Sequence, residues 1–585
     1  MSPGYGKPMN TDQELTRPAD GMNEAYDEVQ RMPGMTLRRM AHACGGVLHI
    51  AGDELQADTE VTMITTDSRE ACEGCLFGAI VGEHSDGHQY IPDVFEAGAL
   101  GVISEQELPD AAGCWIKVAS TIEALGAIAE YYLSVMQIPV VGITGSVGKT
   151  STKEAIASVL AQRYRVLKTA GNFNNELGVP LTIFRLRPGD EIAVIEMGIS
   201  HFGEMHVLAR IVRPDTCVIT NIGDCHLEFL GSRDGVLRAK SEIFDFLSPE
   251  GHIVLNGDDQ HLRRIREAAG VKPVFYGLID ENVPAGLTDS GAGAAAEGNT
   301  AEPEADPVHR DFFADHICPQ GLEGISCRLH MPPAGVYESL LDTAGDGPVW
   351  PLAGSAGSSR ASAAADCDGA GTKPAGQTAI DVRIPMPGRH MVMNALAAAA
   401  VGRIYGLTDD QIRAGLESIA GVSGRFHIIR TGHYTLIDDC YNANPMSVKA
   451  SLSILHDAQG AGMGRRVAIL GDMGELGDEE VRLHEEVGTY AAGCGLSVLI
   501  AVGELSEHLA GAASVSSGSP VWTDGMTEED EATDANRLQI LHFDSVDAFI
   551  ESAQAGTLPL EEGDTILVKA SHFMHFERIL ETLQD

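Results

Sequence analysis

Basic side chains are scarce in this sequence. The 40 Lys and Arg residues face 84 Asp and Glu residues, which gives a formal net charge of −44 at pH 7. Such an acidic chain repels phosphate polyanions, so we expect neither nucleic acid nor an anionic membrane as a partner. An anionic substrate would have to bind in a local pocket of positive charge.

The sequence also lacks the features of secreted and membrane proteins. No run of about 18 apolar residues is present, and the polar segment 1–33 has no apolar core typical of a signal peptide. The 11 cysteines form no paired framework, and Cys72 and Cys75 lack the second pair that a zinc site needs. We therefore expect a soluble, cytoplasmic protein with free thiols.

The chain has 585 residues, of which 44% are hydrophobic, so it can form several cores. Strand and helix patterns alternate in its middle and its C-terminal part, which predicts parallel α/β sheets. Two stretches carry few large apolar residues, which predicts disordered insertions. The expected order is a disordered leader at 1–34, a first domain at 35–136, a central domain at 137–422 with insertions at about 282–306 and 342–376, and a third domain at 423–585.

An apolar strand runs into a glycine loop and a helix at residues 139–151. The segment Thr144-Gly-Ser-Val-Gly-Lys-Thr150 matches a shortened phosphate-binding loop, although Ile143 stands where the strict pattern has glycine. A lysine there can meet the terminal phosphates, and the threonine hydroxyl can bind Mg²⁺. We expect ATP or GTP to be bound by Gly145, Ser146, Gly148, Lys149, Thr150 and Ser151.

Two further strands of the central segment end close to candidate metal ligands. Glu196 follows Ile195 directly, and His226 lies four residues beyond Ile222. Ligands of an open parallel sheet bind beyond the carboxyl ends of its strands, where both side chains could hold Mg²⁺. A capping or ion-paired glutamate and a hydrogen-bonded core histidine are the alternative interpretations.

Lys240 shares a helix face with apolar residues at 236, 237, 243, 244 and 247. Burial would lower the pKa of this lysine, and a neutral amine can react with CO₂ to form a carbamate, which is an anionic metal ligand. The alternative is a lysine whose stem packs while its amine reaches solvent. Periodicity alone favours the alternative.

These residues resemble the Mur ligases of peptidoglycan synthesis, a family that includes folylpolyglutamate synthase, over nearly the whole chain. The segments that carry the resemblance, besides the phosphate loop, are Asp67-Ser-Arg69, 171–180, 438–445, 470–477 and 484–488. The resemblance implies an α/β fold of three domains: an N-terminal UDP-substrate domain, a central P-loop ATPase-like parallel-sheet domain and a C-terminal Rossmann-like domain. It also reverses the interpretation of Lys240 in favour of a carbamate.

The resemblance further implies the roles of individual residues. Lys149, Lys240, His226 and Arg425 would be catalytic, and Mg²⁺ would be held by Thr150, Glu196, His226 and Lys240. Arg425 could bring positive charge to the γ-phosphate, and Asp439, which follows a strand, could bind the ribose. The nucleotide would also contact His390 and Asn394. The substrates would contact Ser68, Arg69, Asn172, Asn174, Asn175, Tyr441, Asn442 and Asn444.

Within the family, the segment Tyr441-Asn-Ala-Asn-Pro445 is most similar to the branch that joins D-alanyl-D-alanine to UDP-N-acetylmuramoyl-tripeptide with ATP. The alternatives are an amino-acid-adding branch and folylpolyglutamate synthase. No Asn-Lys-x-Asp segment typical of GTP-binding switches is present. Met391 and His572 replace residues common in the family, an asparagine and an arginine. We expect a monomer.

Overall fold

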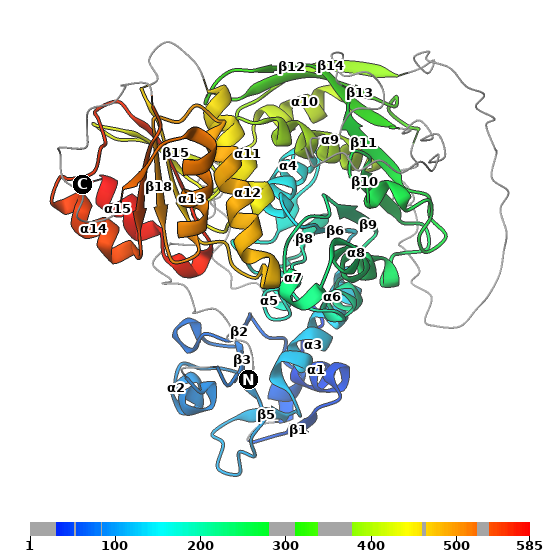
Figure 1. The fold of residues 1–585 in the computed structure, drawn as a ribbon. Coiled ribbons are helices and arrows are strands. Elements are labelled where there is room, and N and C mark those ends of the chain that lie inside the picture. The colour runs from blue at the N-terminus through cyan, green and yellow to red at the C-terminus, as the bar shows by residue number, and fades with distance from the viewer. Residues whose placement is uncertain are drawn as a thin grey trace. The chain divides into compact units, whose positions relative to one another are not determined.

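The structure is a computed structural model that describes residues 31–51, 54–82, 85–279, 310–336, 377–458, 464–522 and 537–584. Both expected insertions and residues 1–30 of the expected leader lie outside these ranges. Residues 31–34 do not behave as part of a leader, because Met32 is fully buried and its N–H donates to the Val61 carbonyl at 2.8 Å. The described chain contains three sheets (Figure 1) and divides into two compact units, which are described in turn.

The first unit contains a five-stranded sheet in the order β1-β5-β4-β3-β2. Only the β1–β5 pair is antiparallel. The Thr36 hydroxyl caps the first helix of this unit, and Gly45 ends that helix with φ of 67°. The strands are β1 (Val47–His49), β2 (Ile64–Thr65), β3 (Leu76–Gly78), β4 (Gly101–Ser104) and β5 (Cys114–Lys117), and the helices are α1 (Leu37–Cys44), α2 (Ile91–Glu96) and α3 (Thr121–Met136).

Residues 167–197 also belong to the first unit, although we expected them in the central domain. They contain most of β7 (Val166–Lys168), together with α5 (Gly178–Ile183) and β8 (Ile192–Glu196). The reason is that α3 packs against α5 and the Tyr132 hydroxyl donates to the Leu186 carbonyl at 2.8 Å. The sequence predicts one boundary between the first and the central domain, whereas the first compact unit also includes the later segment 167–197.

The second unit begins with the strands that carry the phosphate loop. Its central strands lie in the order β14-β13-β12-β11-β10-β9-β6. The pairs from β6 to β12 are parallel, as expected, whereas β12, β13 and β14 form an antiparallel extension that the sequence pattern did not reveal. The strands are β6 (Val140–Thr144), β9 (Thr216–Ile219), β10 (His252–Asn256), β11 (Val274–Leu278), β12 (Phe312–Pro319), β13 (Ile325–Met331) and β14 (Thr378–Ile384).

Helix α4 (Lys149–Leu160) starts at the phosphate loop and packs against two later helices. At Gly415 of α10 the backbones come so close that an added Cβ would lie 2.4 Å from the Val159 Cα. The Ser158 hydroxyl donates to the Gly415 carbonyl at 2.7 Å. The remaining helices of this part are α6 (Glu204–Val212), α7 (Leu227–Leu230), α8 (Arg233–Ser241), α9 (Arg389–Ile404) and α10 (Asp409–Glu417).

The C-terminal part of the second unit is a seven-stranded sheet in the order β15-β16-β21-β17-β18-β20-β19. All pairs are parallel except β15–β16, so the expected Rossmann-like arrangement is found. Its strands are β15 (His427–Arg430), β16 (Thr435–Asp438), β17 (Arg466–Gly471), β18 (Val498–Val502), β19 (Val521–Trp522), β20 (Gln539–Phe543) and β21 (Thr565–Lys569).

Alternating residues of these strands form two cores, one on each face of the sheet. Ala468 and Leu470 of β17 join the core under α11, α12 and α13, whereas Val467 and Ile469 join the core under α14 and α15. Figure 1 shows these helices on the two faces. They are α11 (Pro445–Asp457), α12 (Glu480–Ala492), α13 (Ser506–Ser517), α14 (Val546–Gln554) and α15 (Glu577–Gln584).

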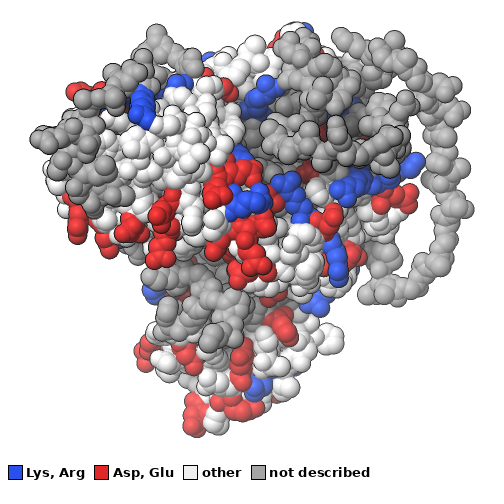
Figure 2. All heavy atoms as spheres, in the orientation of Figure 1, with Lys and Arg blue, Asp and Glu red and all other residues white. Residues whose placement is uncertain are grey.

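Acidic side chains cover much of the face seen in Figure 2, where Lys and Arg gather in fewer places. This distribution agrees with the net charge of −44. Within the described ranges, every helix is too short or too polar to cross a bilayer.

We predict that Gly415→Val weakens the packing of α10 on α4. The added side chain would meet the Val159 backbone, which cannot move away as a flexible side chain could, so we expect a loss of at least about 1–3 kcal/mol of stability. Urea unfolding followed by circular dichroism measures this loss. Gly511→Ala is the matched control, because nothing lies within 4 Å of the added Cβ in α13 and alanine favours a helix. Equal midpoints for the two variants would contradict the prediction.

Candidate active site

The phosphate loop joins β6 to α4 through two glycines with positive φ. Gly145 has φ of 151°, and an added Cβ would lie 1.9 Å from the Thr220 hydroxyl oxygen, so no larger residue fits there. Gly148 has φ of 82° and precedes the first turn of α4. The loop is therefore the tight strand-to-helix turn that the sequence predicts.

The segment after β9 holds this loop in place. Asn221 accepts from the Val147 N–H through Oδ1 and donates to the Val147 carbonyl through Nδ2, both at 2.9 Å. Its own carbonyl accepts from the Ser146 N–H at 3.0 Å. Ser146 Oγ also accepts from the Gly223 N–H at 2.8 Å. The Ser146 and Val147 amides are thus bonded within the protein. The start of α4 remains as the part of the loop where an anion would be favoured.

Lys149, Thr150 and Ser151 begin α4, where the helix dipole favours a phosphate. The Lys149 ammonium group donates to the Gly145 carbonyl at 2.7 Å, back across the loop. Thr150 is buried and Ser151 is half-buried. These three residues have the placement that nucleotide binding requires.

Lys240 lies at the end of α8 with its side chain fully buried. Its Nζ has no hydrogen-bond partner among the described residues. Burial is the main cause that lowers the pKa of Lys240 to about 8; Cys225 opposes the shift, and the positive charge of Lys149 adds to it. The alternative of an amine that reaches solvent is therefore wrong. A buried amine without a partner suits an added carboxylate group and a cation.

His226 contacts the C-terminal part of the chain. Its Nδ1 lies 2.6 Å from Oε2 of Glu475, which follows β17. This contact is the main cause that lowers the pKa of the Glu475 carboxyl group, and His201 contributes as well. His226 is thus neither a core histidine nor isolated in the loop.

Glu196 ends β8 in the first unit, and its side chain is buried. Its carboxylate accepts from the Asn174 amide at 2.9 Å. Of the other two candidate asparagines, Asn175 caps α5 by accepting from the Gly178 N–H at 2.8 Å, and Asn172 is exposed. The asparagine cluster therefore includes one residue that positions the expected metal ligand.

Asp439 has protein partners around its carboxylate. Oδ2 lies 2.7 Å from Lys569 Nζ and accepts from the Ser451 hydroxyl at 2.6 Å, and Oδ1 accepts from the Phe426 N–H. Lys569 is buried and also donates to the Asn442 carbonyl at 2.9 Å. These contacts give Asp439 a structural role beside the ribose contact that the sequence suggested.

Arg425 stacks its guanidinium group over the Tyr441 ring, 4.1 Å from the ring centre. The His572 ring also contacts that of Tyr441, edge-on and with 5.9 Å between the ring centres. The structure thus brings together two predicted site residues and the histidine that departs from the family pattern.

His390 is accessible to solvent, yet the surrounding protein desolvates its ring and lowers its pKa; Asp439 opposes this effect and Lys569 adds to it. Asn394 is buried, accepts from the Thr152 hydroxyl at 3.0 Å and donates to the Met391 sulfur. The departure at Met391 therefore provides a weak acceptor for Asn394, which links α9 to α4.

The remaining predicted residues lie in two loops. Arg69 is exposed and pairs with Asp67 at 2.6 Å beside half-buried Ser68. Asn444 caps α11 by accepting from the Ser447 N–H, and the Asn442 amide oxygen accepts from the next N–H of the chain. Sequence analysis did not single out Glu475, which lies in the family segment 470–477, or Lys569, because only the fold gives them their partners.

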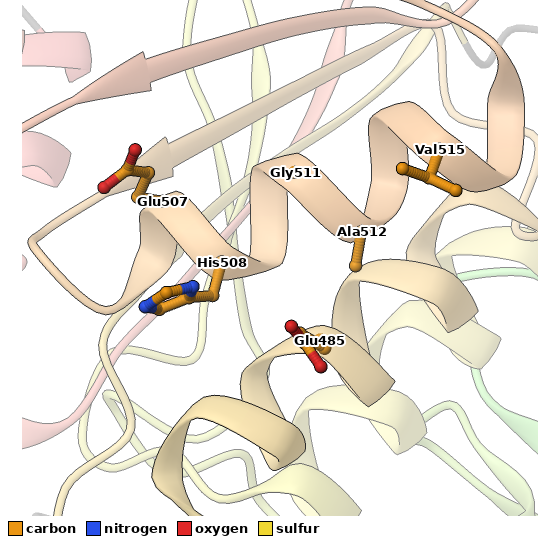
Figure 3. Close-up of a pocket in the computed structure, with 6 residues that line it drawn as sticks. All are labelled: Glu485, Glu507, His508, Gly511, Ala512 and Val515. Atoms are coloured by element: carbon orange, nitrogen blue, oxygen red, sulfur yellow. The ribbon is translucent and has the colours of Figure 1, made fainter.

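A separate groove lies between α12 and α13, away from these residues (Figure 3). Its volume is about 330 Å³, and it is lined by Glu485, Glu507, His508, Gly511, Ala512 and Val515. This lining has two carboxylates and neither Lys nor Arg, so it does not suit a phosphate.

Comparison with known proteins identifies the family of this chain. Residues 143–300 match the Mur ligase middle domain, and residues 424–572 match the Mur ligase, glutamate ligase domain. The chain is 30% identical to the UDP-N-acetylmuramoyl-tripeptide--D-alanyl-D-alanine ligase of Bacillus subtilis (strain 168) over 94% of this chain and 98% of the relative. The enzyme of the same name from Escherichia coli (strain K12) is 31% identical over 92% and 97%.

The crystal structure of MurF from Acinetobacter baumannii has the same fold, with a TM-score of 0.70 and 29% identity over 94% of this chain and 98% of that chain. From these full-length relatives and the two domain matches, we conclude that this chain belongs to the Mur ligase family.

Proposed function

We propose that the protein is an ATP-dependent ligase that joins D-alanyl-D-alanine to the terminal carboxylate of UDP-N-acetylmuramoyl-tripeptide, forming ADP and phosphate. Similarity to ligases of this name over almost the full length of both chains is the observation that carries the proposal. The phosphate loop at the start of α4 supports the use of ATP.

A carboxylate reacts poorly with an amine in water, so the reaction needs an activated intermediate. ATP would transfer its γ-phosphoryl group to the tripeptide carboxylate to form an acyl phosphate. Lys149 and Arg425 would neutralise charge on the transferring group. The amine of D-alanyl-D-alanine would then attack the acyl carbon, and the tetrahedral intermediate would expel phosphate.

Mg²⁺ fits the residues that the sequence predicts for it. Thr150, Glu196, His226 and carbamylated Lys240 would hold it, and the bound ion would offset negative charge on the phosphate oxygens. The buried, unpartnered amine of Lys240 supports this assignment, because a carbamate and a cation would satisfy it.

The parts of the chain would divide the work of binding. The first domain, through Ser68 and Arg69, would bind the UDP end of the substrate, and Asn172, Asn174 and Asn175 would contact its peptide. His390, Asn394 and Asp439 would contact ATP, and Tyr441, Asn442 and Asn444 would contact substrate. We propose a cytoplasmic monomer that acts on small molecules.

We predict that phosphate release by the purified protein requires ATP, UDP-N-acetylmuramoyl-tripeptide and D-alanyl-D-alanine together. Omitting each in turn should abolish phosphate release, because the acyl phosphate forms on one substrate and is consumed by the other. A coupled phosphate assay with product mass determination measures this requirement. Turnover with a single amino acid in place of the dipeptide would instead identify the amino-acid-adding branch, and turnover with folate and glutamate would identify folylpolyglutamate synthase.

We predict that Lys240→Ala folds but loses nearly all turnover, because an anionic ligand is missing. Lys240→Arg should be equally inactive, since a guanidinium group keeps its positive charge and forms no carbamate. Added acetate or formate should restore part of the activity of Lys240→Ala by occupying the vacated position. Near wild-type turnover of Lys240→Arg would show that a simple cation suffices there.

The lowered pKa of Lys240, about 8, predicts a dependence on pH and CO₂. Only the neutral amine reacts with CO₂, and at pH 7 about a tenth of the groups are neutral, against about one in 3,000 for a lysine of ordinary pKa. At a fixed concentration of dissolved CO₂, raising the pH from 6 to 8 should therefore speed the recovery of enzyme freed of CO₂. Recovery is followed by turnover and by ¹³C NMR of the carbamate carbon, with Lys240→Ala as control. No carbamate signal at pH 8 would contradict the assignment.

A further inference from the structure

Two residues with unusual backbone conformation face each other where the central and C-terminal parts of the second unit meet. His226 has φ of 53° and Glu475 has φ of 60°, a left-handed region that residues other than glycine seldom adopt. Their side chains are in contact, with 2.6 Å between Nδ1 of His226 and Oε2 of Glu475. Such strain persists only where the surrounding structure holds it in place, and it concentrates at functional sites.

The turn that carries Glu475 is held from several sides. The Met473 N–H donates to His484 Nε2 at 2.9 Å, and the Gly474 N–H donates to the Ser571 hydroxyl at 2.9 Å. Both Met473 and Leu476 are buried in the core under α11, α12 and α13. The Glu475 carboxylate therefore lies on a turn that hydrogen bonds and buried side chains hold in place.

The tautomer of His484 explains why this turn is firm. Its Nδ1 lies 2.7 Å from the Glu480 carbonyl, which can only accept, so Nδ1 carries the proton. Nε2 is then the acceptor that the Met473 N–H requires. His484 is completely buried, and burial lowers its pKa, which keeps the ring neutral. The two family segments at 470–477 and 484–488 thus act as one support for Glu475.

His226 is held just as closely on its own side. Its carbonyl accepts from the Phe229 and Leu230 N–H groups, so it begins α7. Gly477, two residues after Glu475, packs so close to α7 that an added Cβ would lie 3.2 Å from the Glu228 Cα. The contact between the two side chains is therefore part of a fitted surface between α7 and the turn.

We propose that Glu475 is a positioning residue that orients the His226 imidazole for metal binding in the ligase reaction. The Glu475 carboxylate lies 2.6 Å from Nδ1 without the alignment of a hydrogen bond, so it acts through its charge. That charge favours the proton on Nδ1, which leaves Nε2 unprotonated and makes it a better electron donor. Nε2 of His226 is then the atom that binds the cation. Because Glu475 belongs to the C-terminal part, the ligand is completed only when that part contacts α7. This inference rests on the proposed function, in which His226 binds Mg²⁺.

The test uses Mn²⁺ as a spectroscopic probe for Mg²⁺ in the full-length protein saturated with a non-hydrolysable ATP analogue. Electron paramagnetic resonance measures the affinity and number of bound Mn²⁺ ions. Glu475→Gln should weaken the His226-dependent Mn²⁺ site by about 10–100-fold, as loss of such outer contacts does elsewhere. Turnover should fall by lowering kcat at standard Mg²⁺, with KM for D-alanyl-D-alanine unchanged, and raised Mg²⁺ should restore part of it.

Glu479→Gln is the matched control, because Glu479 lies in the same turn region but pairs with Arg482 at the surface. This control should keep wild-type Mn²⁺ affinity and turnover. His226→Ala should lose the same Mn²⁺ site, and Glu475→Gln in the His226→Ala background should have no further effect.

Wild-type Mn²⁺ affinity in Glu475→Gln, or an equal further loss in the double variant, would overturn the inference. Thermal melting of each variant separates this result from misfolding, and Glu475→Asp provides a second variant if Glu475→Gln unfolds. Failure of the proposed function has a different signature, since the wild-type protein itself would then release no phosphate in the presence of all three substrates.

Discussion

The pairing of Asn221 with the backbone of Val147 is the contact on which the rest of the site depends. Both polar atoms of the amide are used, one on the N–H and one on the carbonyl of the same residue, at 2.9 Å each. The two hydrogen bonds resemble those that pair neighbouring strands, so they hold the loops after β6 and β9 together. The phosphate loop and the segment that carries His226 are thereby fixed relative to each other.

A second constraint is the burial of Lys240, whose amine interacts electrostatically with Lys149 of the phosphate loop. A fully buried amine with no partner among the described residues destabilises a protein unless it is neutralised or modified, which supports the carbamate proposed for Lys240. The positive charge of Lys149 lowers the pKa of Lys240 further. In the proposed mechanism, phosphate binding at Lys149 and carbamate formation at Lys240 would therefore be linked through electrostatics, in a protein whose net charge of −44 otherwise repels anionic substrates.

The C-terminal part contributes charged groups that the central part lacks. Lys569 is buried against Asp439, Arg425 stacks on Tyr441, and Glu475 reaches His226. Each of these contacts joins residues that are near in space and mostly distant in sequence. Of the three, only the contact between Glu475 and His226 crosses to the central part, so this pair forms only when the two parts meet.

The sequence by itself determined the phosphate loop, the parallel strands around it and the family, because these depend on short-range spacing and alternation. It also placed Lys240 on an apolar face but left its amine undecided, since periodicity does not reveal whether a long side chain reaches solvent. Only the tertiary structure decided that the amine is buried, that Asp439 is shared with Lys569, and that Glu475 contacts His226. It also revealed the antiparallel extension formed by β12, β13 and β14, and the packing of 167–197 with the first unit. The physical reason is that burial and ion pairing depend on which distant segments come together, and local propensity does not determine these long-range contacts.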